Sequence, residues 1–211
     1  MNLPAILSPK QSPPVAGPPA RLCVLASGSG SNFAAISDAI ERGELNARIC
    51  CVIHNVLDAG VVARASERAV PSVFVDHRAY KSRQAFDACI VQLLSKHAID
   101  WVIMAGWMRL CTDVLLDAYE GRILNIHPSL LPSFGGLRAV EQALAAGVKI
   151  SGCTVHVVTA AMDAGPIIAQ AAVAVESDDT ARSLHARIQV QEHRLYPIGI
   201  NLALGLSISK T

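Results

Sequence analysis

The sequence predicts a single-domain α/β protein with a mostly parallel, twisted sheet and helices on both faces. Apolar runs typical of buried strands alternate with helix-like segments from residue 21 to about residue 150. Strands that are apolar throughout belong to parallel sheets covered on both faces. Hydrophobic residues make up 52% of the 211 residues and charged residues only 17%, which favours one packed core over disorder.

The first twenty residues are predicted to form a mobile tail outside the fold, so that the folded domain spans residues 21–211. Six of the eleven prolines fall in this segment, at Pro4, Pro9, Pro13, Pro14, Pro18 and Pro19. Such a segment cannot hold a helix or a central strand, because proline lacks the backbone N–H that both structures use.

The strands and helices of the domain are then expected in alternation. The expected strands cover residues 21–26, 47–53, 72–75, 101–105 and 122–126, and the expected helices cover residues 33–42, 59–69 and 83–97, with a short helical piece before residue 122. After residue 150 the rhythm changes to two consecutive strands, 151–158 and 167–175, the second a candidate for an antiparallel edge. A last helix is expected from residue 181 to about residue 204.

Charge and cysteine usage exclude several classes of protein. A net charge of +1 provides no strong field for nucleic acid or anionic lipid. No apolar stretch is long enough to span a membrane. Six cysteines occur without a CxxC pair or a zinc-like Cys/His spacing, so we expect reduced core residues of a cytoplasmic protein and no metal site.

A glycine-rich loop follows the first strand of the domain. It reads Gly28, Ser29, Gly30, Ser31, Asn32 and precedes a helix, an arrangement in which backbone amides point at an anion such as a phosphate. The third glycine of a dinucleotide fingerprint and the Walker lysine are both absent, which disfavours nicotinamide and ATP. A tight strand-to-helix turn without a ligand is an open alternative.

Polar side chains also stand at the end of the strand near residue 126. Asn125 and His127 are two residues apart, so on a strand they project to one face, and Pro128 ends the strand. Ligands in open α/β sheets collect at this end of the strands. The alternative is a polar strand end that is only hydrogen-bonded. Asp163 lies in a Gly-Pro turn, and spacing alone cannot bring it to His127.

Two polar residues of the last helix share a face. Gln189 and Glu192 are three residues apart, which places them on one side of a helix. A solvated polar surface is the ordinary interpretation of such a pair.

These segments together resemble the folate-dependent formyltransferase family. Residues 125–132 read Asn-Ile-His-Pro-Ser-Leu-Leu-Pro, and about thirty residues later the chain reads Asp-Ala-Gly-Pro-Ile-Ile from Asp163. Residues 25–32 look like the family's phosphate loop, and residues 105–110 look like its folate-pocket segment. The resemblance covers about residues 21–204 and implies a Rossmann-like formyltransferase fold.

The resemblance implies formyl transfer from 10-formyltetrahydrofolate to the amine of glycinamide ribonucleotide, in de novo purine biosynthesis, through a tetrahedral intermediate. Asn125 and His127 would donate hydrogen bonds to the developing oxyanion. Asp163 would favour the charged imidazolium and relay a proton. No covalent enzyme intermediate or metal is required, and the partners are small molecules bound by a monomer or homodimer, without nucleic acid or membrane.

The resemblance also implies two binding sets. The ribonucleotide would contact Gly28, Ser29, Gly30, Ser31, Asn32, Gln189 and Glu192. The folate would contact Arg83, Met108, Arg109, Leu110, Ala160, Ala161 and Met162.

One departure and three alternatives accompany this interpretation. Family members often carry histidine near residues 138–140, where this chain has Arg138 and Val140. Methionyl-tRNA formyltransferases typically add a basic loop and a carboxyl-terminal domain, which we do not expect here. Formyltetrahydrofolate deformylases usually begin with a regulatory domain that twenty Pro-rich residues cannot form. A non-catalytic folate- or nucleotide-binding protein is a third alternative, because a fold alone does not establish activity.

Overall fold

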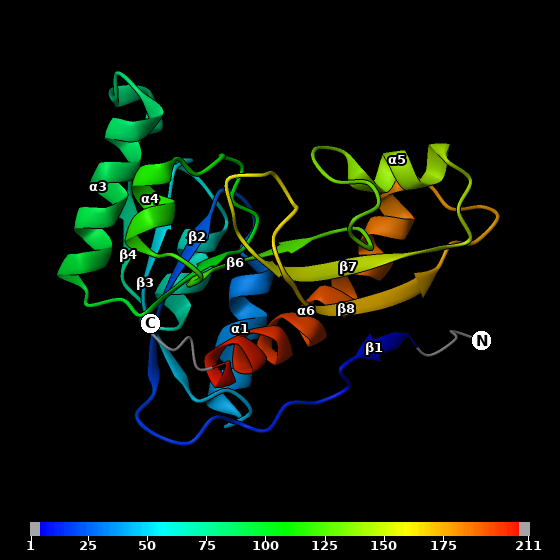
Figure 1. Cartoon of the computed structure of the whole chain (residues 1–211), viewed down its shortest axis with the longest axis horizontal. Helices are drawn as coiled ribbons and strands as arrows, with labels where there is room; N and C mark the ends of the chain where they lie inside the picture. Colours follow the sequence, from blue (N-terminus) through cyan, green and yellow to red (C-terminus); the bar gives the residue numbers. More distant parts are fainter. Residues whose placement is uncertain (1–4, 207–211) are drawn as a thin grey trace.

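An eight-stranded sheet forms the centre of the computed structural model, which describes residues 5–206 (Figure 1). Its strand order is β1-β8-β7-β6-β5-β2-β3-β4. The strands are β1 (Ile6–Ser8), β2 (Ala20–Ala26), β3 (Ala47–His54), β4 (Ser72–Phe74), β5 (Trp101–Met104), β6 (Ile123–His127), β7 (Ile150–Val157) and β8 (Ile167–Ala174). The helices are α1 (Ser31–Glu41), α2 (Val61–Glu67), α3 (Arg83–Lys96), α4 (Asp113–Ala118), α5 (Ala139–Ala145) and α6 (Ala181–Gly205), with a 3-10 turn at His77–Ala79.

The predicted mostly parallel sheet is confirmed. Strands β2 to β6 pair in parallel, β7 runs antiparallel to β6, and β8 runs antiparallel to β7. The expected edge position of β8 is wrong, because β1 pairs along its outer side. The carboxyl ends of β2, β5 and β6 meet at one side of the sheet, where ligands collect in open α/β folds.

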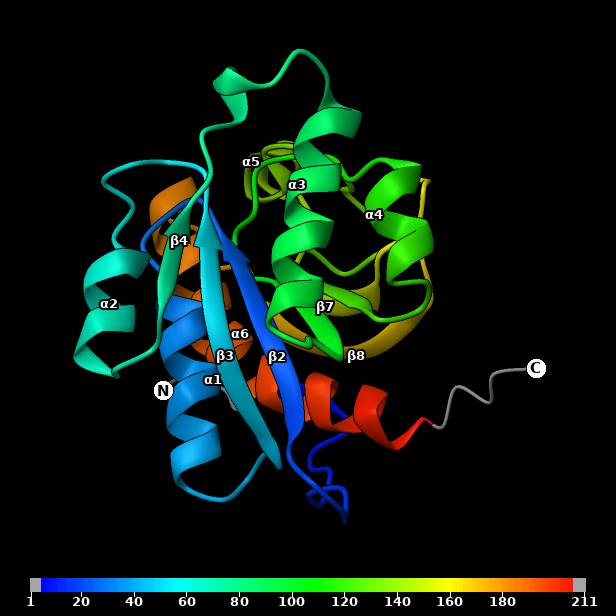
Figure 2. The ribbon, with the colours of Figure 1, turned by 90° about the vertical axis from the view of Figure 1, so that its left-hand side faces the viewer.

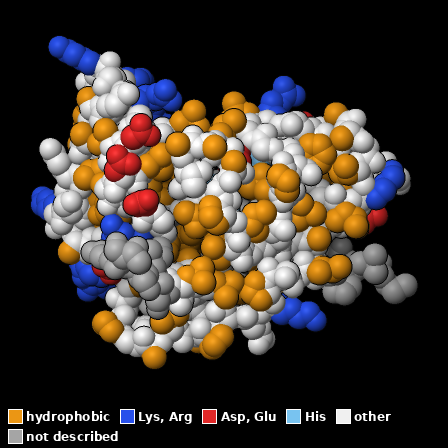
Figure 3. Space-filling model, viewed as in Figure 1, with side chains coloured by type: hydrophobic (Ala, Val, Ile, Leu, Met, Phe, Trp, Pro, Cys, Tyr) orange, Lys and Arg blue, Asp and Glu red, His pale blue; other side chains and the backbone are white. Residues whose placement is uncertain are grey.

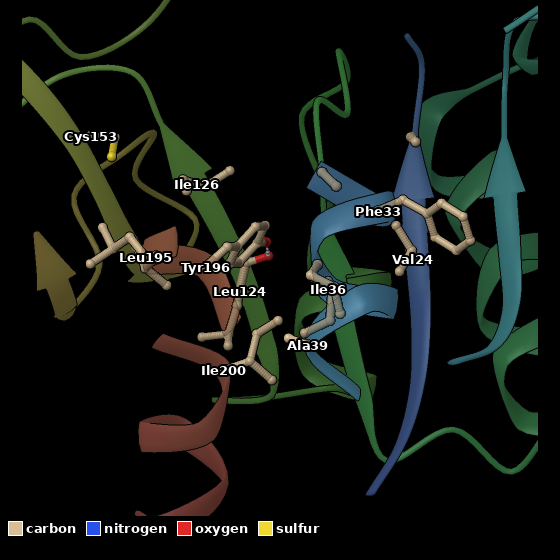
Figure 4. Close-up of a cluster of buried hydrophobic side chains, with 14 of the residues drawn as sticks. Val24, Phe33, Ile36, Ala39, Leu124, Ile126, Cys153, Leu195, Tyr196 and Ile200 are labelled. Atoms are coloured by element: carbon tan, nitrogen blue, oxygen red, sulfur yellow. Dashed lines mark hydrogen bonds between the residues drawn. The ribbon is translucent and has the colours of Figure 1, made fainter. Parts of the chain in front are cut away.

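The two faces of the sheet carry separate apolar cores. Leu22 and Val24 of β2 belong to the core that contains α1 and α6, whereas Cys23 and Leu25 belong to the core that contains α3 and α4. Figure 2 shows these helix pairs on opposite sides of β2 and β3. In the α6 core, the Tyr196 hydroxyl donates to the carbonyl oxygens of two strands, β5 and β6, amid the apolar side chains of Figure 4. The apolar run of each strand therefore fits burial on both faces.

The amino-terminal segment corrects the expected tail outside the fold. Residues 6–8 form β1, which lengthens the sheet, and Leu7 is buried. Farther along, the Asn201 side chain donates to the carbonyl oxygens of Ser12 and Pro13 and accepts from the Val15 amide. Proline does not prevent this arrangement, because an edge strand and an extended segment need few backbone donors. Residues 5–20 are thus packed on the domain, and residues 1–4 lie outside the described part.

Besides β1, two other short elements were not anticipated. The 3-10 turn at 77–79 and helix α5 fall in segments where no element was expected. α5 begins after Arg138, whose φ of 60° is left-handed, and it buries Val140 and Ala143. Seven residues give too short a periodic pattern to read from sequence. Within residues 5–206, no helix combines the length and apolar character needed to cross a bilayer.

Candidate active site

Strand β6 places Asn125 and His127 on the same face of the sheet, as the alternation predicted. Leu124 and Ile126, which alternate with these two residues along the strand, point to the opposite face and into the α6 core. The His127 side chain is only 8% exposed, while Asn125 is half-buried. The opposite face of β6 is packed, so these two polar groups are left to line a cleft.

Asp163 reaches the same place from the turn between β7 and β8. Its Oδ2 lies 3.4 Å from His127 Nδ1. Asp163 has a φ of 52°, a left-handed conformation that aspartate tolerates better than most residues. Two residues on, a Cβ at Gly165 would overlap the Val157 carbonyl oxygen, so the turn requires glycine there. The fold therefore brings Asp163 to His127, which sequence spacing alone could not do.

His156 is a site residue that the sequence reasoning did not single out. It lies opposite Asn125 in the antiparallel β6–β7 pair, and its Nε2 is 3.1 Å from Asn125 Nδ2 and 3.6 Å from Asp163 Oδ1. Its side chain is only 2% exposed. The signal was available in the alternation of β7, where Cys153 and Val155 belong to the α6 core and His156 faces the other way.

The hydrogen bonds of His156 fix its protonation and the orientation of Asn125. Burial lowers the pKa of His156, an effect that the Val157 carbonyl and Asp163 oppose and His127 reinforces, so the ring is neutral at neutral pH. Because a carbonyl only accepts, the ring proton sits on Nδ1 and donates to Val157. Nε2 is then an acceptor, so Asn125 donates to it and keeps a second N–H for the cleft.

The segment of residues 132–138, here called the Phe134 loop, covers His127 and Asp163 with its backbone. His127 Nε2 donates to the Phe134 carbonyl at 2.9 Å, and the Gly136 amide donates to Asp163 Oδ2 at 2.8 Å. The Ser129 hydroxyl donates to the Ser133 carbonyl and holds the start of the loop. Arg138 is exposed and Val140 is buried, and both line the cleft.

A cleft of about 1000 Å³ is lined by Asn125, His127 and Asp163. Six of the seven predicted folate-binding residues line it: Arg83, Met108, Arg109, Leu110, Ala160 and Met162. Ala161 does not. Figure 3 shows apolar side chains scattered across the face seen in the view of Figure 1, with both basic and acidic side chains toward its edge. The exposed apolar side chains of Met108, Leu137 and Met162 line the cleft, and such a lining suits a flat, partly apolar ligand.

The predicted ribonucleotide residues form a second group, which does not line this cleft. The Asn32 amide donates to Glu192 Oε2 at 2.9 Å, and Gln189 donates to the Ser31 hydroxyl at 3.1 Å. These bonds join the start of α1 to α6. Glu192 is buried, and this burial raises the pKa of its carboxyl, against the lowering effects of Asn32, His185 and His127.

The glycine loop (residues 28–32) leaves its helix start open. α1 has no side-chain cap, and its N-cap Gly30 has a φ of 76°. A Cβ at Gly30 would lie 2.7 Å from Val61 Cα, so the close contact with α2 also requires glycine. Among residues 5–206, the buried Oδ1 of Asn32 finds no hydrogen-bond partner. Open amides beside an unpaired buried acceptor are features of a polar ligand site.

Comparison with known proteins matches residues 20–200 to the model of the formyl transferase family. The chain belongs to this family. It is 42% identical to phosphoribosylglycinamide formyltransferase of Bacillus subtilis over 187 residues, which cover 89% of this chain and 96% of that protein. It is 39% identical to the Escherichia coli protein of the same name, over 85% of each chain. The structure of glycinamide ribonucleotide transformylase 1 from Symbiobacterium toebii superposes with a TM-score of 0.88 at 48% identity, covering 90% of both chains.

Membership of the formyl transferase family confirms the resemblance drawn from the Asn125 and Asp163 motifs. It also confirms the Rossmann-like fold, because the solved relatives share it over nearly the whole domain. The matched residues begin at residue 20, where the amino-terminal segment ends.

Proposed function

We propose that this chain transfers a formyl group from 10-formyltetrahydrofolate to the amine of glycinamide ribonucleotide. One observation supports this above all: Asn125, His127 and Asp163 converge in a cleft of about 1000 Å³, a size that suits a ligand as large as a reduced folate. The names and high coverage of the bacterial relatives support the same substrates.

The reaction needs a stabilised oxyanion and a path for one proton. The amine nitrogen attacks the formyl carbon, a C–N bond forms, and the carbonyl oxygen takes the negative charge. The intermediate then collapses, the bond to the folate N10 breaks, and the proton lost by the amine ends on N10. Asn125 and His127 donate to the oxyanion, and each such donor supplies roughly 3–4 kcal/mol of transition-state stabilisation.

Asp163 is the proposed proton relay. Its Oδ2 faces His127, and its Oδ1 lies 3.6 Å from the Nε2 of His156. The single lone pair of that nitrogen already accepts the hydrogen bond from Asn125. His156 therefore orients Asn125 and borders Asp163 without exchanging a proton with it.

The folate would lie along the cleft past Met108 and Met162. Arg83 and Arg109 supply cations for the carboxylates of its glutamate tail. The Arg109 guanidinium is 4.9 Å from the centroid of the Phe86 ring, so stacking fixes its position. The apolar middle of the cleft would take the ring systems.

The ribonucleotide would bind between the glycine loop and α6. The open amides at the start of α1 suit its phosphate, because the helix dipole adds partial positive charge there. Glu192 has one carboxylate oxygen bonded to Asn32, and the other is free for a ribose hydroxyl or the glycinamide part. Gln189, held by Ser31, completes the polar wall.

The deciding experiment mixes the protein with 10-formyltetrahydrofolate, with and without glycinamide ribonucleotide. Deformylated folate that forms only with the ribonucleotide, together with one formylated ribonucleotide per folate, supports the transferase. Folate release without the ribonucleotide identifies a deformylase. Binding of both ligands without turnover identifies a non-catalytic protein. Sedimentation of the same sample distinguishes the monomer and homodimer that the proposal leaves open.

A further inference from the structure

Ser27 is the residue at which the glycine loop meets the wall of the folate cleft. It follows β2 directly and is half-buried. Its backbone amide donates to the Gly106 carbonyl at 3.1 Å, and its hydroxyl oxygen accepts from the Met108 amide at 3.1 Å. Ser27 thus makes two hydrogen bonds to the turn that follows β5.

A buried amide sets the direction of the Ser27 hydroxyl. Its single proton donates to Asn55 Oδ1 at 2.7 Å, and Asn55 is only 7% exposed. Asn55 Nδ2 lies 3.4 Å from His77 Nδ1, which fixes the amide in turn. Because the proton is spent on Asn55, a lone pair remains for the Met108 N–H. The hydroxyl is therefore held as an acceptor for the cleft wall.

The wall so held is the segment 106–110, which presents Met108, Arg109 and Leu110 to the cleft. The ring of Trp107, inside this segment, stacks on Phe86 at 6.1 Å between centroids. In the other direction, the residue after Ser27 is Gly28, whose carbonyl accepts from the Val61 amide. A ligand that settles in the glycine loop thus acts on the residue that sets the position of Met108.

We propose that Ser27 is a positioning residue that couples the two substrate subsites. Its hydroxyl fixes the position of the 106–110 wall relative to the glycine loop. A bound ribonucleotide therefore raises the affinity for the folate, and a bound folate raises the affinity for the ribonucleotide. The coupling rests on the proposed function, since that function assigns the two ligands. Thermodynamic reciprocity requires that each ligand raise the affinity of the other by the same factor.

The test uses tetrahydrofolate and glycinamide ribonucleotide, a pair that lacks the formyl group and cannot react. Calorimetry gives the Kd of tetrahydrofolate with and without saturating ribonucleotide. The wild-type chain binds it more tightly with the ribonucleotide. In Ser27→Ala the Kd of tetrahydrofolate rises about three- to tenfold, the range for one lost hydrogen bond. The ribonucleotide then no longer lowers this Kd. Ser27→Thr restores both, because it keeps the hydroxyl.

Kinetics separate positioning from general damage. Ser27→Ala raises the KM for the formyl donor and leaves kcat at saturation within about twofold, because the catalytic groups stay in place. Asn55→Ala keeps Ser27 but removes the acceptor of its hydroxyl proton, and it shows the same effects more weakly. This variant replaces Ser27→Ala in the test if Ser27→Ala folds poorly. Ser95→Ala, at an exposed site on α3, behaves as wild type.

Two results would overturn the coupling. One is a wild-type Kd for tetrahydrofolate that is the same with and without the ribonucleotide. The other is a Ser27→Ala variant that keeps both the wild-type Kd for tetrahydrofolate and its decrease with the ribonucleotide. A wild-type chain that binds neither ligand refutes the proposed function instead, so the two failures are distinct.

Discussion

The glycine loop and the Phe134 loop both border the site, but they are held in opposite ways. Other elements hold the glycine loop: the Arg64 guanidinium donates to the Ser29 carbonyl, and α6 bonds to Ser31 and Asn32. The Phe134 loop instead forms hydrogen bonds through its own backbone, from His127 to the Phe134 carbonyl and from the Gly136 amide to Asp163. The glycine loop is thus preformed and open, whereas His127 and Asp163 are bonded to backbone atoms that a ligand at these groups must replace.

This difference assigns different costs to the two substrates. A ligand that binds a preformed loop loses little free energy to reorganisation. A formyl group that takes a hydrogen bond from His127 Nε2 must first displace the Phe134 carbonyl. Changes to the glycine loop should therefore alter binding, and changes beneath the Phe134 loop should alter turnover.

Asp163→Asn should give the largest effect. Asparagine keeps an oxygen for the Gly136 amide but removes the charge beside His127, so the loop contact can persist while the relay is lost. We expect kcat to fall about 100- to 1000-fold, with a much smaller change in KM. Steady-state kinetics measures both. A variant with near-normal kcat and an unchanged melting temperature would remove Asp163 from the mechanism.

Gly30→Ala should weaken binding of the ribonucleotide and leave binding of the folate unchanged. The new Cβ would meet Val61 at 2.7 Å in a left-handed conformation, which displaces the glycine loop. We expect the ribonucleotide Kd to rise about tenfold, equal to about 1.4 kcal/mol. Gly43→Ala is the matched control, because Gly43 has a φ of 72° but nothing within 4 Å of the added Cβ. Equal loss of affinity in both variants would contradict the glycine-loop assignment.

Sequence alone predicted the parts of the site that depend on local pattern. Alternation along β6 placed Asn125 and His127 on one face, and the same rule applied to β7 would have found His156. It could not give the register that sets His156 opposite Asn125, because register depends on the pairing of whole strands. Asp163 lies in a turn without periodicity, so only its family motif pointed to it.

The amino-terminal segment was mispredicted for a related reason. Its proline content indicated correctly that it forms no helix or central strand. Its anchor is Asn201, which lies far along the chain on α6 and bonds to the segment's backbone. A polar residue on a helix carries no sequence signal that names its partner, so packing of this kind requires the coordinates.

Binding of both substrates should alter protease cleavage of the Phe134 loop. Leu137 is 80% exposed, which makes the loop accessible to chymotrypsin or thermolysin in the free protein. If the substrates replace the bonds from Phe134 and Gly136, the rate of nicking within residues 132–138 should change several-fold, while cleavage elsewhere stays constant. Mass spectrometry of the fragments locates the cut. Nicking at an unchanged rate with both ligands would mean that the loop keeps its place.

The smallest effect expected is on stability in acid, through His156. Burial holds the pKa of this ring below its ordinary 6.5, so below pH 6.5 the unfolded chain binds a proton that the folded chain refuses. The free energy of unfolding should therefore fall as pH drops from 6.5 toward the folded pKa and be unaffected by this group above 6.5. His156→Gln removes the titrating ring, so urea unfolding at pH 7.5 and 5.5 should show a smaller acid loss than in wild type. His97→Gln, at the end of α3 and outside the cleft, should keep the wild-type loss. If His156→Gln loses as much stability in acid as the wild type, the buried ring is not neutral, and the orientation assigned to Asn125 would have to be reversed.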